Sequence, residues 1–332
     1  MFSNSSMSNN TLPINKHVSS LNLLRGVAAV SVVLFHFIPT NMEGESALRS
    51  FFFLGHHGLH LFFLISGFVI PYSMYIKNYE IKKFFQYFKK RLVRIEPPYI
   101  ASILLILLVR FVSAQVYGFE FGINWEQFWL HFFYLNRYFG HEGYAIIYWT
   151  LGIEFQFYII AGLTVPLLVH ANKWVSFVTL GVFATACHLI VLPWDWFIFQ
   201  YGFLFLLGIV TFQFYVKYIT KYEYALLGVV GLIGLNSGLG IESAITAILG
   251  MLAILFIKKE WKVSNFFGNI SYSLYLTHTE AAGWFMLFTG SYFANKLIHA
   301  IVAIVFAIVF AIVFHRLIEK PFLKLSKKIK YS

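Results

Sequence analysis

The chain alternates between long runs of apolar residues and short polar segments. A helix needs about 20 apolar residues to cross the ~30 Å hydrocarbon core of a bilayer, and the runs have about this length. They are continuous and lack the alternation of a membrane-spanning strand, which excludes a transmembrane β-barrel. We predict ten helical spans, at 20–39, 51–76, 97–116, 146–170, 175–192, 196–216, 224–240, 241–257, 265–288 and 297–316.

The pair 224–240 and 241–257 has almost no polar break between its members. Glu242 is the one charged residue there, and Asn236-Ser237-Gly238 supplies a turn signal. The combined segment is longer than one span requires, so we predict two short helices.

Composition supports the same architecture. Of 332 residues, 59% are hydrophobic and 12% are charged, against roughly 45–50% and ~25% in soluble proteins. The chain lacks the charged residues that would cover a soluble domain, and it is too apolar to be disordered. The single cysteine, Cys187, excludes an intrachain disulfide and a cysteine metal site. The expected fold class is an all-α polytopic membrane protein.

Lysine and arginine set the expected orientation. With a cytoplasmic N-terminus, 21 of the 25 basic residues fall on inside segments and three, Arg49, Arg137 and Lys296, fall outside. Both termini are then cytoplasmic. The net charge of +11 is mainly this topology signal, so we expect contact with the lipid bilayer and no nucleic-acid partner. We expect a disordered tail at 1–19, a membrane domain at 20–322 and a basic tail at 323–332.

Ionisable residues inside spans are costly and indicate function. Arg25 and His36 are eleven residues apart, which places them on one helix face about 16 Å apart along the axis. Depth along the spans predicts that several polar groups share the outer half of the membrane. We expect one polar cavity opening outward, the alternative being separate structural pairs. The polar groups expected in this outer half are His36, His56, His57, His60, Arg110, Glu154, His278 and Glu280.

The inside loop 77–96 interleaves aromatic and basic residues, a pattern typical of an amphipathic interfacial helix. Arg91 and Arg94 are three apart and share a face, so they could clamp one phosphate. Plain anchoring by positive charge is the alternative.

Six motifs together resemble the acyltransferase-3 family of integral membrane O-acyltransferases, and they occur in that family's order. His60 stands where the family frequently has an acid. The motifs are Leu24-Arg25-Gly26 with His36, and the segments 58–68, 90–97, 148–158, 270–278 and 318–322.

The resemblance implies a multi-pass protein of the bacterial inner membrane. It implies transfer of an acyl group, most often acetyl, from cytoplasmic acyl-CoA to a sugar hydroxyl of an extracytoplasmic or lipid-linked glycan. No metal is expected. His36 would act as base or acyl acceptor, and Glu154 would orient it or pair with a cation. Arg25, Arg91 and Arg94 would contact the donor.

His60, Arg110 and His278 are expected to line the acceptor cavity. The alternative function is a transporter or flippase of a glycan or lipid-linked precursor, for which intramembrane charges are equally natural. A non-catalytic membrane scaffold is the third possibility. The sequence leaves the acceptor, the acyl group and the oligomeric state open.

Overall fold

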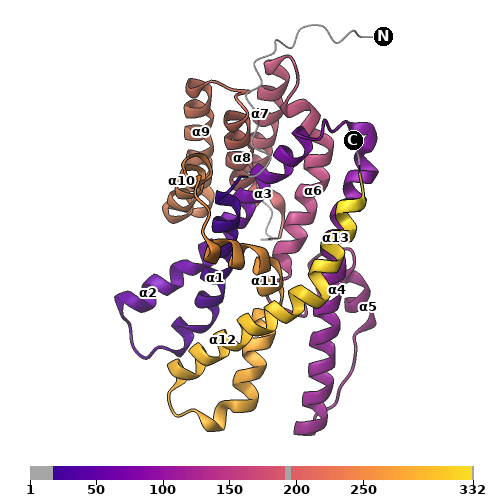
Figure 1. Ribbon diagram of the computed structural model, residues 1–332, viewed down its shortest axis with the longest axis vertical. Helices are drawn as coiled ribbons and strands as arrows, with labels where there is room; N and C mark the ends of the chain where they lie inside the picture. Colours follow the sequence, from indigo (N-terminus) through magenta and orange to yellow (C-terminus); the bar gives the residue numbers. More distant parts are fainter. Residues whose placement is uncertain (1–17, 191–195, 331–332) are drawn as a thin grey trace.

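The computed structural model describes residues 18–190 and 196–330, and these segments contain helices but no strand (Figure 1). The tail predicted at 1–19 lies almost entirely outside the described residues. The α-helices are α1 (Ser20–Phe37), α2 (Ala47–Phe53), α3 (Gly58–Tyr75), α4 (Phe84–Tyr117), α5 (Trp125–His131), α6 (Trp149–Leu168), α7 (Lys173–Leu189), α8 (Ile198–Tyr215), α9 (Lys221–Leu239), α10 (Ile241–Phe256), α11 (Lys262–Thr289), α12 (Lys296–Phe314) and α13 (Lys320–Lys328).

Short 3₁₀ or π-helical turns lie between several of these helices. They are η1 (Pro39–Asn41), η2 (Leu54–His57), η3 (Ile81–Lys83), η4 (Asn136–Phe139), η5 (Gly290–Tyr292) and the π-helical turn η6 (His315–Glu319).

Each of the ten predicted spans falls on an α-helix. Among the described residues, seven helical segments are long and apolar enough to cross a membrane, while α7 and α10 are shorter apolar helices. The predicted division into 224–240 and 241–257 is confirmed, because α9 ends at Leu239 and α10 begins at Ile241, while the turn signal at Asn236-Ser237-Gly238 lies within α9. The chain is therefore a polytopic helical membrane protein. α11 is not one of the seven candidate segments. Its polar residues Ser273, Thr277 and His278 are buried inside the fold.

The loop 77–96 and the span 97–116 were expected to be separate, and this was wrong. A single helix, α4, runs from Phe84 to Tyr117 with Pro97 and Pro98 inside it. The proline pair predicts a helix start because proline lacks the N–H that an interior position donates. Packing of α4 against α6, α11 and α13 holds the helix through these positions. Arg91 and Arg94 thus lie on the same continuous helix as the apolar span.

Helix α3 occupies the middle of the molecule, between α1 on one side and α8 on the other (Figure 1). Two glycines allow α3 and α8 to approach closely. A Cβ atom added at Gly67 would lie 2.2 Å from the backbone oxygen of Phe205, and one added at Gly208 would lie 2.3 Å from that of Leu64. Only glycine fits such a crossing. Gly67 therefore serves the close packing of α3 on α8.

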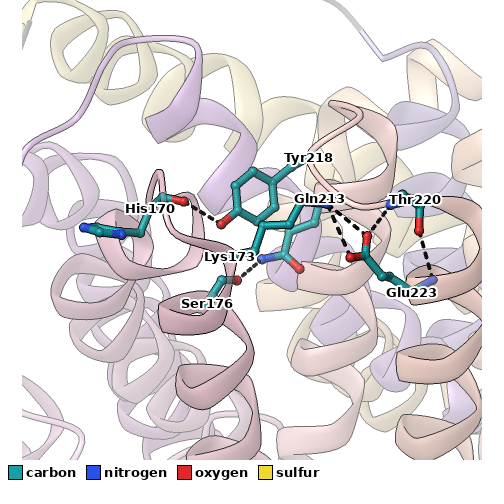
Figure 2. Close-up of polar contacts among 7 residues, drawn as sticks. All are labelled: His170, Lys173, Ser176, Gln213, Tyr218, Thr220 and Glu223. Atoms are coloured by element: carbon teal, nitrogen blue, oxygen red, sulfur yellow. Dashed lines mark hydrogen bonds and ion pairs between the residues drawn. The ribbon is translucent and has the colours of Figure 1, made fainter. Parts of the chain in front are cut away.

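Polar side chains join the ends of α6, α7, α8 and α9 (Figure 2). Tyr218 donates a hydrogen bond to the backbone oxygen of His170, and buried Gln213 donates to Ser176. Lys173 pairs with Glu223 at 3.1 Å. These contacts fix the short connections of a helix group that packs on α3 through α8 and α10.

Candidate functional site

A cavity of about 1110 Å³, including its open mouth, lies between α1, α3, α4, α6, α11 and the start of α13. Apolar side chains such as Phe62 and Phe63 form much of its wall, and polar groups from distant parts of the chain converge on it. The polar and charged lining residues are Asn22, Arg25, Ser66, Arg91, Arg94, Thr150, Glu154, Tyr158, Asn269, Ser271, Tyr272, Tyr275 and Glu319.

Three arginines share this cavity. Arg25 comes from α1, and Arg91 and Arg94 come from the first half of α4. The guanidinium of Arg91 donates to Ser73 at 3.1 Å and lies 5.6 Å from the ring centre of Tyr158. A planar, permanently charged donor held in this way is suited to phosphate or carboxylate oxygens. The structure therefore brings together the three residues that the sequence analysis assigned to the donor.

Glu154 faces the same cavity from α6. The hydroxyl of Ser66 on α3 donates to a Glu154 carboxylate oxygen at 3.0 Å. This contact was not predicted from the sequence. The signal that could have indicated it is the position of Ser66 in the motif 58–68. Glu154 thus lies with the arginines rather than beside His36.

Glu319 is a second carboxylate of the cavity wall, and no site residue was predicted there. It ends η6, where a π-helical turn interrupts the helix between α12 and α13. It accepts hydrogen bonds from Ser273 at 2.5 Å and from His315 at 2.9 Å. Turns of this kind often occur at functional sites. The signal that could have found Glu319 is its place in the closing motif 318–322.

A smaller cavity adjoins the first and shares Arg91, Glu154 and Tyr158 with it. Its other polar residues are Glu96 and Tyr134, whose hydroxyl donates to the Glu96 carboxylate at 2.7 Å. Tyr134 belongs to the connection that follows α5, so this cavity extends from the arginines toward that connection.

His36 and His278 lie together, outside the lining of the main cavity. Their ring centres are 5.2 Å apart, and His278 is fully buried. Tyr275 links the two places, because it lines the cavity and its ring centre is 6.0 Å from that of His278.

His60 and Arg110 lie apart from the main cavity, from the His36 and His278 pair, and from each other. His60 contacts His57, with 3.0 Å between their Nδ1 atoms. Arg110 donates to the backbone oxygen of Tyr144, whose ring stacks on His131 of α5. Burial, together with the nearby Arg110 charge, lowers the pKa of His131 to about 4.

The single outward-opening cavity that depth predicted is not observed in the described part of the chain. His36 and His278 form one pair, His60 belongs to a histidine cluster beside α10, and Arg110 lies near α5. Only Glu154 of the expected set lines the main cavity. Depth follows from counting residues, whereas the direction in which a side chain points depends on how each helix is rotated and packed. Residues that were predicted to lie at equal depth therefore lie in different parts of the structure.

Comparisons with known proteins agree with this architecture. The family described as the acyltransferase domain, acyltransferase-3, matches residues 18–316. A protein of the Acidianus two-tailed virus whose name describes it as an acetyltransferase is 24% identical over 286 residues, which are 77% of this chain and 80% of that protein.

The O-acetyltransferase OatA of Staphylococcus aureus is 24% identical over 170 residues, which are 48% of this chain. The chain matches only 26% of that relative's length. No solved structure matches the chain. The family match spans nearly the whole described membrane domain, so the chain belongs to the acyltransferase-3 family and is a membrane enzyme of the O-acetyltransferase type.

Proposed function

We propose that this enzyme moves an acetyl group from acetyl-CoA to a sugar hydroxyl of an extracytoplasmic or lipid-linked glycan in a bacterial inner membrane. The observation that carries the proposal is the convergence of Arg25, Arg91 and Arg94 on one cavity that also contains Glu154. A cluster of arginines suits an anionic donor, and the apolar wall suits its uncharged arm.

The donor would enter from the side of 77–96, which the positive-inside rule places in the cytoplasm. Arg91 and Arg94 would hold phosphate groups of the donor. Arg25 lies on α1, the helix that also carries His36. The acyl arm would extend past Tyr275 toward the His36 and His278 pair.

His36 is the proposed base. The acceptor oxygen attacks the carbonyl carbon of the thioester while a ring nitrogen of His36 takes the hydroxyl proton. A carbon–oxygen bond forms and the carbon–sulfur bond breaks. The proton passes from His36 to the departing sulfur, so the products are the ester and free thiol. Glu154, held by Ser66, would keep one arginine oriented in the cavity.

The test uses membranes from cells that produce the full chain. Radiolabelled acetyl-CoA is added, and label incorporated into the glycan fraction is measured against acetyl-CoA concentration. Arg91→Gln removes a charge-assisted contact of about 1.5–3 kcal/mol, so the half-saturating concentration rises roughly tenfold to a hundredfold. Lys89→Gln is the matched control, because Lys89 is exposed on the same helix and does not line the cavity.

His36→Ala should abolish incorporation while the protein still accumulates in the membrane. Mass spectrometry of the surface glycans then identifies the acceptor by its acetyl mass increment. Suppose no glycan gains label, and a glycan instead disappears from the surface of cells that lack the protein. The transport function would then replace the proposed one.

A further inference from the structure

His278 is a fully buried residue of α11, packed against the end of α1. These two helices approach closely along their length. A Cβ atom added at Gly268 would lie 2.4 Å from the backbone oxygen of Asn22, and Asn22 also hydrogen-bonds Asn265. The position of His278 relative to α1 is therefore set by rigid backbone packing rather than by a flexible side chain.

The hydrogen bonds of His278 settle which ring nitrogen carries the proton. Its Nδ1 lies 2.8 Å from the backbone oxygen of Tyr275 and 3.1 Å from that of Leu274. A carbonyl oxygen can only accept, so Nδ1 must carry the hydrogen. A neutral imidazole has one N–H, which leaves Nε2 as an acceptor.

That acceptor has no protein partner among the described residues, although it is buried. Leaving a buried acceptor unpaired costs about 1–3 kcal/mol, and most such groups in native proteins are satisfied. An unpaired group of this kind calls for an explanation. The nearest titratable ring is that of His36, at 5.2 Å between ring centres.

A second histidine pair shows that two rings at this separation can share a hydrogen bond. The ring centres of His57 and His60 lie 4.9 Å apart, and those rings share a nitrogen–nitrogen contact of 3.0 Å. His36 is half-buried, and in the described part of the chain its ring has no hydrogen bond. A small rotation of the His36 ring would bring one of its nitrogens within hydrogen-bond reach of the His278 acceptor.

We propose that His278 is a positioning residue that accepts an N–H hydrogen bond from His36. This fixes one tautomer of His36 and leaves its other nitrogen unprotonated for the acyl-transfer step. The inference rests on the proposed role of His36 as the base. His278 gains and loses no proton in the cycle. It stabilises the His36 imidazolium that exists between removal of the hydroxyl proton and its delivery to the thiol sulfur.

The experiment compares three variants of the full chain. His278→Phe keeps the ring volume and removes the acceptor. His278→Gln supplies an amide that can donate to the Tyr275 carbonyl and accept from His36. Thr277→Val is the matched control, because among the described residues the buried Thr277 hydroxyl bonds only the Ser273 backbone oxygen of its own helix.

The first readout is acetyl transfer from labelled acetyl-CoA in membranes, measured from pH 5 to 9. We expect His278→Phe to lower the maximal rate about tenfold to a hundredfold, the range seen when the hydrogen-bond partner of a metal-ligating histidine is removed. The half-saturating acetyl-CoA concentration should stay unchanged. The pH at which the transfer rate falls on the acid side of the pH–rate profile should shift. His278→Gln should restore much of the rate, and Thr277→Val should match the wild type.

The second readout needs no acetyl transfer. Diethyl pyrocarbonate acylates an unprotonated imidazole nitrogen, and peptide mass spectrometry follows the labelling of His36 in detergent-solubilised protein. His278→Phe should slow this labelling, while Thr277→Val leaves it unchanged. A wild type that labels as expected but transfers no acetyl would reject the proposed function alone.

Equal transfer rates and equal labelling in His278→Phe and Thr277→Val would overturn the positioning role. Loss of both His278 variants from the membrane, with Thr277→Val retained, would also overturn it, because it would make His278 a structural residue only.

Discussion

The crossing of α3 and α8 makes a sharp prediction about Gly208. An alanine Cβ there would lie 2.3 Å from the backbone oxygen of Leu64 and 2.8 Å from Gly67, whereas ordinary contacts lie at 3.4–4 Å. The obstacle is backbone, which cannot rotate away as a side chain would. The two helices must therefore separate by about 1 Å, and overpacking of this kind costs about 1–3 kcal/mol.

A second glycine supplies the control. Nothing lies within 4 Å of a Cβ built at Gly181 on α7. Alanine in a helix is favoured over glycine by about 0.5–1 kcal/mol, and this gain applies to both variants. We expect Gly181→Ala to be slightly more stable than the wild type, and Gly208→Ala to be less stable than Gly181→Ala by about 2 kcal/mol, because the helix gain is common to both.

Reversible unfolding in mixed micelles, followed by tryptophan fluorescence and circular dichroism, measures this difference. Movement of α3 should also lengthen the Ser66 to Glu154 hydrogen bond, now 3.0 Å, and reduce acetyl transfer. Equal unfolding free energies for Gly208→Ala and Gly181→Ala would refute the argument, because the crossing would then tolerate a Cβ that the distances exclude.

Three further outcomes follow from polar groups away from the cavity. Gln213→Leu removes the buried amide that donates to the Leu168 carbonyl and to the Ser176 hydroxyl, while the carbonyl keeps its hydrogen bond from Ser176, so it should lower the unfolding free energy by about 1–3 kcal/mol. Glu223→Gln disturbs a partly exposed pair and should cost less than about 1 kcal/mol, so a larger loss than in Gln213→Leu contradicts the ranking. His131 is predicted to make stability fall with acid, since its pKa in the folded chain, about 4, lies below its usual value near ~6.5. The unfolded chain then binds the proton first, so this contribution is complete above ~6.5 and decreases as pH falls toward 4, by about 2 kcal/mol at pH 5. Unfolding curves of wild type and His131→Gln at pH 7.5 and 5 check this, and a parallel loss in both excludes His131 as the cause.

Most of the helical architecture was predictable from the sequence. Each predicted hydrophobic run falls on an α-helix, and the length of the combined run predicted the break between α9 and α10, whereas the turn signal at Asn236-Ser237-Gly238 lies within α9. The boundary at Pro97 was not predictable in this way. Local proline chemistry favours a helix start there, but tertiary packing along α4 prevails.

The candidate site was predictable in part. The spacing of Arg91 and Arg94 put both on one face, and that face does line the cavity with Arg25. The partner of Glu154 was not predictable, because Ser66 lies 88 residues away and meets it only through the packing of α3 on α6. Glu319 was missed for the same reason, since its exposure to the cavity depends on the π-helical turn that ends there.

The contact between α1 and α11 has a consequence for biosynthesis. Asn22 and Asn265 are hydrogen-bonded across 243 residues of sequence, and α11 is the most extensive packing partner of α1. A ribosome adding about 5–20 residues per second makes this partner roughly 12–50 s after α1 has emerged. During that time Arg25 and His36 are already in a nascent helix whose main neighbour does not yet exist. Helix α1 must therefore be inserted on its own hydrophobicity and kept available for docking until these further 243 residues have been synthesised.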